Sequence, residues 1–248
     1  MYLDPVEEYA DLCTWIEPLI GQAISPKNFA QRLGRWLNRS HPTRVKLFLG
    51  KDENLDRGDF CIGAEYDPEL DQAYRKQLII NLIVNHPKTS HWEITSDIAD
   101  RFVLELVETL VHEYQHQHQY RSRRYKEHKE HFVSEHEDTA IKNEQEYLGN
   151  PDEIDAYAAN IAARIFLVNY KLSDNTTQPI EDSDSLDLKN YYKAFGQEHE
   201  VVQKLLVKIQ ENITYLKDVD DGKIRKRRKP SGRPTLSRRD ESRGWFRS

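Results

Sequence analysis

Cysteine, methionine and long apolar runs are all scarce in this 248-residue sequence. It contains two cysteines, Cys13 and Cys61, and one methionine. Two cysteines cannot form the disulfide framework of a small secreted domain, so we expect a reducing, cytoplasmic setting. No apolar run approaches the roughly 20 residues of a membrane span, and the first residues, MYLDPVEEYADL, are acidic rather than signal-like. These absences argue against a secreted protein and predict no contact with a membrane.

Charge of both signs is abundant but is distributed unevenly. Residues 223–248 contain eleven Lys and Arg against two acids, a net charge of +9, which leaves −15 on residues 1–222. Such a basic segment repels itself and has little apolar surface to bury. We therefore predict one folded domain over residues 1–217 and a basic, disordered tail over residues 218–248. Residues 223–248 could bind nucleic acid or an acidic partner.

The hydrophobic pattern predicts an α+β fold, with a small sheet followed by helices. Apolar residues recur at helical spacing or in short β-rich runs. The expected helices are 5–20, 26–38, 96–124, 151–170 and 186–216, and the expected strands are 45–49, 60–66 and 77–85. We found no signal that decides between helix and loop for residues 121–143, and residues 173–185 are typical of a surface loop.

Some boundaries have specific signals. Ser25 followed by Pro26 predicts an N-cap and a first helical residue. Ser96 or Asp97 can cap the long helix that follows the last strand. The run QLIINLIVN at 77–85 is apolar at nearly every position, which predicts a strand buried on both faces.

The clearest chemical motif is HExxH at residues 112–116, inside the strongest predicted helix. Positions i and i+4 project from one helical face, so His112 and His116 can supply two ligands to a tetrahedral Zn²⁺. Glu113 would lie beside the metal, where it can accept a proton from bound water and pass it to a leaving amine. The alternative interpretation is an exposed helix rich in His, Glu and Gln.

A hydrolytic zinc site needs a third protein ligand, and we select Glu153. Over roughly residues 75–170 the sequence resembles the gluzincin-type zinc metallopeptidases, including short intracellular members such as the IrrE-like proteins. Those families follow HExxH with a helix that bears a glutamate ligand, commonly Glu-x-x-Ala, and this chain has EIDAYAA at 153–159. The alternatives are Asp155 as the ligand, or Glu153 as an acid that only stabilises a helix start.

The resemblance carries further expectations. It implies a zincin-like fold, in which the alanines after Glu153 let the two helices approach closely. Several gluzincins place Asp or Asn four residues after the glutamate to support a histidine ligand, whereas this chain has Tyr157 there. Asp155 or Asn160 could replace that support, or Tyr157 could face the substrate. NPDEIDAYA also resembles predicted metallopeptidases of tailed bacteriophages, which would place the protein in the host cytoplasm.

Several other side chains were considered for the site. A tyrosine often stabilises the oxyanion in this class of enzyme, and the candidates are Tyr147, Tyr157, Tyr191 and Tyr192. His118 is turned about 200° from His116 and should face elsewhere. The remaining histidines of this region, His128, His131 and His136, are expected on the surface.

Two functions from different classes follow. The first is a zinc-dependent intracellular metallopeptidase that hydrolyses a protein or peptide substrate, with His112, His116 and Glu153 on Zn²⁺ and Glu113 as general base. The resemblance implies that the substrate would lie along an edge strand, although the composition of 77–85 favours a central one. The second is a non-enzymatic nucleic-acid-associated or assembly protein that acts through its basic tail.

Overall fold

The computed structural model describes residues 3–41, 43–74, 78–88, 90–172 and 185–222. Nearly all of the predicted surface loop at 173–185 lies outside the described residues. The basic segment 223–248, for which the sequence predicts a nucleic-acid or acidic partner, also lies outside them. Within the described ranges, no helix is long and apolar enough to cross a membrane. Neither Cys13 nor Cys61 forms a disulfide within the described residues.

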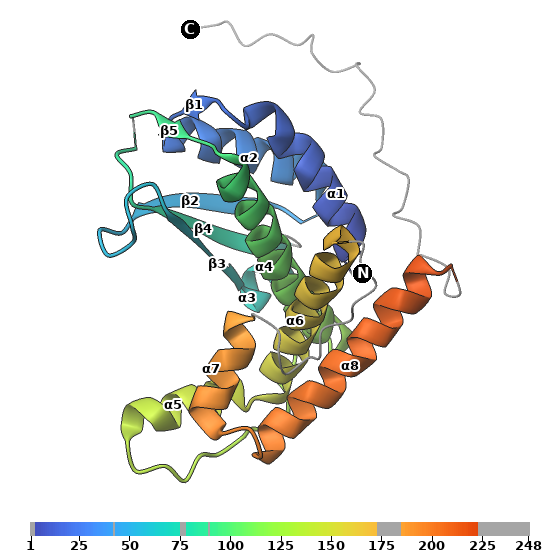
Figure 1. The fold of residues 1–248 in the computed structure, drawn as a ribbon. Coiled ribbons are helices and arrows are strands. Elements are labelled where there is room, and N and C mark those ends of the chain that lie inside the picture. Colours follow the sequence, from blue (N-terminus) through green and yellow to red (C-terminus); the bar gives the residue numbers. More distant parts are fainter. Residues whose placement is uncertain (1–2, 42, 75–77, 89, 173–184, 223–248) are drawn as a thin grey trace, which may run out of the picture.

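The fold is mixed α and β, as predicted, and its N-terminal part is helical (Figure 1). It consists of α1 (Pro5–Ile16), the 3-10 turn η1 (Glu17–Leu19) and α2 (Pro26–Ser40). The predicted start of α2 is confirmed, because the Ser25 hydroxyl accepts a hydrogen bond from the Asn28 N–H and Pro26 is the first helical residue.

The main sheet has three strands in the order β2–β4–β3. They are β2 (Val45–Lys51), β3 (Phe60–Tyr66) and β4 (Leu78–Val84), with β2 parallel and β3 antiparallel to β4. A separate antiparallel ribbon joins β1 (Ala23–Ile24) to β5 (Trp92–Glu93). Helix α3 (Pro68–Tyr74) lies between β3 and β4 in the chain.

Strand β4 is central, as its composition favours, so it is not an edge strand that could bind a substrate. The expectation that it is buried on both faces is wrong. Only alternate residues, such as Ile80 and Leu82, are fully buried. They share a core with Phe102 and Leu106 of α4, whereas the opposite face of the sheet is more open, with Phe48 of β2 53% exposed. Strand β4 therefore has one buried face and one half-buried face.

The long helix α4 (Ser96–Ser122) carries the HExxH motif. Its N-cap is Thr95, whose hydroxyl accepts from the Ile98 N–H, and not Ser96 or Asp97 as predicted. The undecided stretch 121–143 contains the last turn of α4, an irregular segment and the start of α5 (Thr139–Leu148). The chain reverses just after α4, where Arg124 and Tyr125 have positive φ angles of 55° and 63°.

Three helices complete the described chain: α6 (Pro151–Leu172), α7 (Leu186–Phe195) and α8 (Glu200–Asp220). The single helix predicted over 186–216 is wrong, because Gly196 ends α7 with φ 81°, a conformation that suits glycine. The ring Nδ1 of His199 then caps α8. The predicted domain boundary at residue 217 falls within α8.

Two hydrophobic clusters organise these elements. The first joins α1, α2, the sheet and α4, and the second joins α5, α6, α7 and α8. Helix α6 contributes to both, since Ala163 and Leu167 pack in the first cluster while Ala158 and Ile161 pack in the second. The interface between α4 and α6 therefore lies where the two cores meet.

Candidate metal centre

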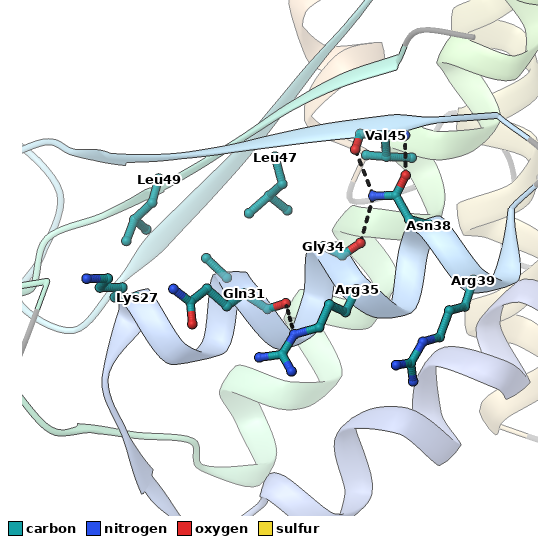
Figure 2. A pocket seen from close by; sticks show the side chains of 10 residues that line it. Lys27, Gln31, Gly34, Arg35, Asn38, Arg39, Val45, Leu47 and Leu49 are labelled. Atoms are coloured by element: carbon teal, nitrogen blue, oxygen red, sulfur yellow. Dashed lines mark hydrogen bonds between the residues drawn. The ribbon is translucent and has the colours of Figure 1, made fainter. Parts of the chain in front are cut away.

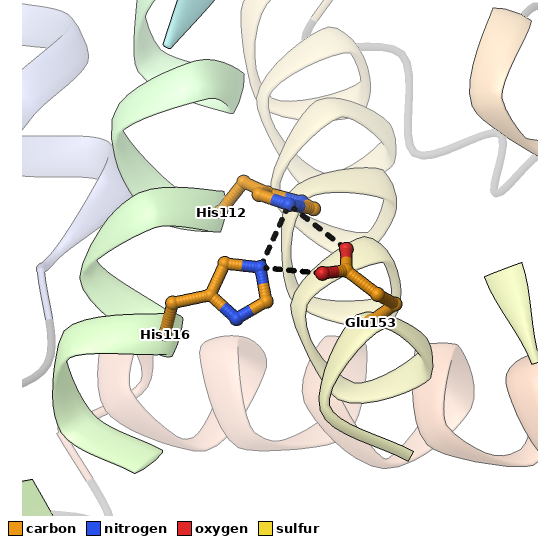
Figure 3. A group of neighbouring side chains, drawn as sticks. All are labelled: His112, His116 and Glu153. Carbon is orange, nitrogen blue, oxygen red and sulfur yellow. Dashed lines mark hydrogen bonds and ion pairs between the residues drawn. The ribbon is translucent and has the colours of Figure 1, made fainter. Parts of the chain in front are cut away.

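His112, His116 and Glu153 come together at the interface between α4 and α6 (Figure 3). The Nε2 atom of His116 lies 3.1 Å from Nε2 of His112 and 3.3 Å from Oε1 of Glu153. The Nε2 atom of His112 lies 3.5 Å from Oε2 of Glu153. All three side chains are mostly buried, between 10% and 14% exposed. The structure thus brings together the three side chains that the sequence singled out.

The packing of α4 against α6 creates this meeting point. The two helices run antiparallel: Glu153 at the start of α6 meets His116 late in α4, and Arg164 later in α6 pairs with Glu108 at 2.8 Å, earlier in α4. Small residues let the helices approach, as expected, since Ala156 and Ala163 are almost completely buried. The side chain of Glu153 therefore reaches across to the histidines.

The distances in the cluster suit a metal ion. Two neutral imidazoles with their Nε2 lone pairs facing each other at 3.1 Å repel unless a proton or a cation lies between them. Donors held about 2.0–2.1 Å from a tetrahedral Zn²⁺ lie roughly 3.3 Å from one another, and the three measured separations range from 3.1 to 3.5 Å. Two imidazoles and one carboxylate also leave a fourth position for water. The donor set fits zinc.

A glutamine fixes the orientation of the His116 ring. The Nδ1–H of His116 donates to Oε1 of Gln119 at 3.0 Å, in the tautomer that turns the Nε2 lone pair toward Glu153. Gln119 is itself held, because its Nε2 donates to the carbonyl of Asp152 at 3.0 Å. Sequence reasoning missed Gln119, although its position three residues after His116 on the same helix was a usable signal.

The charges of the cluster are coupled. Burial alone would raise the pKa of Glu153, but interactions with His112 and His116 outweigh it and lower the pKa to about 2. Burial alone would lower the pKa of His116, yet the hydrogen bond to Glu153 and its charge raise it above its ordinary value. The site therefore favours an ionised carboxylate facing positive charge.

Glu113 lies beside the cluster and is only 6% exposed. Burial raises the pKa of its carboxyl, and the nearby charges of His112 and His116 oppose that shift. The backbone N–H of Tyr66, the last residue of β3, lies close enough to the Glu113 carboxylate to lower its pKa slightly. Strand β3 is an edge of the main sheet, so its unpaired edge reaches the site.

A buried ionic network anchors Tyr66 next to Glu113. The Asp71 carboxylate of α3 is completely buried and accepts two N–H bonds from Arg121 at 2.7 and 2.8 Å. The hydroxyls of Tyr66 and Tyr125 donate to the same carboxylate at 2.7 and 2.9 Å. This network ties the end of α4 to the end of β3 and thereby positions the strand beside the site.

Two of the four candidate tyrosines lie at the cluster. The Tyr157 ring packs edge-on against His112, with ring centroids 4.5 Å apart. Burial, the charge of Glu153 and hydrogen bonds with Tyr157 and Glu153 raise the pKa of Tyr147, a residue that is half exposed. Tyr191 is fully buried, and its hydroxyl donates to the Leu148 carbonyl; Tyr192 packs with the second core. Of these four tyrosines, Tyr147 therefore best fits the expected role of donating a hydrogen bond to the oxyanion.

The other acids and amides that the sequence suggested lie elsewhere. Asp155 faces α8, where it pairs with Lys208 at 2.8 Å, so it neither joins the cluster nor supports a histidine. The Nδ2 of Asn160 donates to Asp187 of α7 at 3.0 Å and not to a histidine. Asp187 itself, which lies far from the motif in the sequence, gave no signal of its own.

The surface histidines are placed as predicted. His131 and His136 are exposed, and His128 is half-buried. The Nδ1 atoms of His128 and His136 accept hydrogen bonds from backbone N–H groups two residues further along the chain. Within the described ranges, the group of side chains that could hold a metal ion does not include them or His118.

A cavity of about 790 Å³ lies away from this centre, between α2 and β2 (Figure 2). Lys27, Arg35 and Arg39 line one wall, and apolar side chains of β2 form another part of the lining. The amide of Asn38 bonds both the N–H and the carbonyl of Val45, which occupies part of the outer edge of β2. The lining residues include no acid, histidine or cysteine, so the cavity holds no constellation for catalysis.

Comparisons with protein-family models, with curated proteins and with solved structures found no match.

Proposed function

We propose that the protein is a zinc-dependent metallopeptidase of the gluzincin type, with a zincin-like arrangement of its site. The observation that carries the proposal is the convergence of His112, His116 and Glu153, with separations of 3.1–3.5 Å between their facing donor atoms. Bound there, Zn²⁺ would supply Lewis-acid chemistry, lowering the pKa of a water molecule and polarising the carbonyl to be attacked.

Glu113 would move the protons. Its carboxylate accepts a proton from the attacking water and then donates it to the nitrogen of the leaving amine. A raised pKa suits the first transfer, because a carboxylate whose pKa lies nearer to neutrality is a stronger base and takes the proton of the water more readily. The nearby backbone N–H of Tyr66 favours the ionised form of the carboxylate.

Tyr147 would donate its hydroxyl to the oxygen on which negative charge develops. Its pKa is raised by burial and by Glu153, so the phenol stays protonated and able to donate at neutral pH. Tyr157, packed on the His112 ring, would restrict that imidazole and exclude water from one side of the site.

Strand β3 would take the substrate backbone. It is the edge strand whose last residue contacts Glu113, so an extended peptide paired along it would run past the base. This assignment replaces the central strand at 78–84, which has a partner on both sides.

The test uses the full-length protein, its zinc content and its cleavage of fluorescein-labelled casein and of a mixed peptide library read by mass spectrometry. His112→Ala and Glu153→Ala should lose zinc and hydrolysis together. Glu113→Gln should retain zinc and lose hydrolysis by about 10²–10⁴-fold.

Two matched controls separate ligation from general damage. His118→Gln alters a histidine of the same helix outside the cluster, and Asp155→Asn alters an acid close to Glu153 that pairs with Lys208. Both should retain zinc and activity. Equal zinc content in the wild type, His112→Ala and Glu153→Ala would contradict the proposal.

A further inference from the structure

One nitrogen of the metal cluster has no hydrogen-bond partner in the described part of the chain. The Nδ1 of His112 is buried and unbonded, whereas the corresponding Nδ1 of His116 donates to Gln119. A histidine that offers Nε2 to a metal carries its proton on Nδ1, and a buried N–H without an acceptor costs free energy. The Nδ1–H of His112 therefore needs a hydrogen-bond acceptor.

Helix α6 does not supply that acceptor. The position four residues after Glu153 holds Tyr157, whose ring packs edge-on against His112 and brings no carboxylate. Asn160 follows on the same side of the helix, but its Nδ2 is bonded to Asp187. The Oδ1 of Asn160 is buried and has no hydrogen-bond partner among the residues described. The Asn160 amide therefore makes no hydrogen bond with Nδ1 of His112.

Asp187 is the carboxylate that reaches this place from another element. It lies in the first turn of α7, where Ser185 caps the helix. Its Oδ2 accepts from Asn160 at 3.0 Å. Asn160 lies about one helical turn after Tyr157, whose ring packs on His112, so the bond to Asn160 holds the Asp187 carboxylate on the side of α6 that faces His112. Burial raises the pKa of Asp187, and the bond to Asn160 and the charges of His112 and Arg164 oppose that shift.

The neighbouring cation is engaged by another acid. Arg164 pairs with Glu108 of α4 at 2.8 Å, and Glu108 is one helical turn before His112. Asp187 is therefore left with an amide as its bonded partner at the site, although a largely buried carboxylate needs strong donors to offset its desolvation. An imidazole N–H is such a donor.

We propose that Asp187 is the positioning residue of His112: its carboxylate accepts the hydrogen bond from Nδ1–H, directly or through one water, and so directs Nε2 to the metal. The inference rests on the proposed metal site. In this arrangement α7, and not α6, supplies the acceptor for His112. Asn160 holds the Asp187 side chain in place.

The experiment measures Zn²⁺ affinity of the full-length protein by competition with a chelator of known affinity. Asp187→Ala and Asp187→Asn should each bind Zn²⁺ about 10–100-fold more weakly than the wild type, with Asp187→Asn the milder variant because its amide oxygen still accepts a bond. Asp155→Asn, the matched control, should bind as the wild type does.

A second readout distinguishes positioning from a loss of folding. Co²⁺ bound in place of Zn²⁺ reports ligand geometry through its visible absorption, which should change in Asp187→Asn and stay unchanged in Asp155→Asn. Wild-type affinity and an unchanged Co²⁺ spectrum in Asp187→Asn would overturn the inference alone. A wild-type protein that binds neither ion would instead overturn the proposed function, and with it this inference.

Discussion

Helix α4 contributes to two buried clusters that contain histidine, one on each of two faces, and the clusters differ in how many of their hydrogen-bonding groups have partners. Toward the N-terminal helices, His41 bonds Glu8 through Nε2 at 3.0 Å and the Tyr114 hydroxyl through Nδ1 at 3.1 Å. Toward α6, His112 and His116 point their Nε2 atoms at each other and at Glu153.

The difference separates a histidine with a structural role from two histidines that could bind a metal ion. Both ring nitrogens of His41 have partners, so that cluster is complete and links α1, the segment after α2, and α4. The second cluster leaves Nδ1 of His112 unbonded within the described chain and holds two Nε2 atoms in contact. Unpartnered buried polar groups are rare in folded proteins, so this cluster has hydrogen-bonding capacity that a water or an ion could use.

The largest expected effect is on stability in the presence of metal. Zn²⁺ at a free concentration about 1,000-fold above its Kd should stabilise the protein by about 4 kcal/mol, because only the folded chain assembles the site. Urea unfolding with and without Zn²⁺ measures this increment. Glu153→Ala should show almost none of it, and an equal increment in that variant would mean that zinc binds elsewhere.

Removing His41 from its fully bonded cluster should lower the stability of the protein and leave zinc binding unchanged. His41→Ala leaves Glu8 and Tyr114 buried without their partner, so we expect a loss of about 3 kcal/mol in the free energy of unfolding. Its zinc content should equal that of the wild type. If His41→Ala lost zinc but kept its stability, the distinction between the two clusters would fail.

The metal-free site should impose a pH dependence on stability. The folded-state pKa of Glu153, about 2, lies below its ordinary value of 4.5, so its contribution is present above pH 4.5 and is lost as the pH falls toward 2. The pKa of His116 is raised above 6.5, so its contribution is present below pH 6.5 and is lost as the pH rises through the folded-state value.

Urea unfolding of chelator-treated protein across this range measures both limbs. On the acid side the Glu153 contribution is on the order of 3 kcal/mol. Glu153→Gln removes both contributions, so the difference between the wild type and this variant should peak between pH 4.5 and 6.5. A difference that does not vary with pH would show that these groups are not coupled in the folded state.

The smallest effect concerns the orientation of one ring. Gln119→Ala removes the acceptor of the His116 Nδ1–H, so Zn²⁺ should bind about tenfold more weakly, a change of about 1.4 kcal/mol. Chelator competition measures the affinity. Gln119→Glu restores an acceptor and should recover most of the loss; no recovery would assign the effect to the bond between Gln119 and Asp152 instead.

Much of the fold could be predicted because its signals are local. The Ser25–Pro26 start of α2, the three strands and the long helix with HExxH depend on spacing and capping within a few residues. The errors have local causes too. Thr95 took the cap expected of its neighbours, and Gly196 broke a helix that the apolar pattern would have continued.

The candidate site could be predicted only in part. His112, Glu113 and His116 share one helix, so helical geometry fixes their mutual placement. Glu153 was selected through a resemblance, and the structure brings it to the histidines. Gln119 was within reach of the same helical argument, but Asp187 comes from α7, and no spacing within α4 or α6 points to it.

The sequence by itself determined which side chains share one helical face, since imidazoles at i and i+4 with a carboxylate at i+1 are placed by local geometry. Tertiary structure decided which histidines are satisfied and which are not. The partners of His41 come from α1 and α4, while His112 meets Glu153 and Tyr157 of α6. Such contacts depend on how distant helices pack, and packing follows the burial of apolar faces far from the polar groups that it brings together.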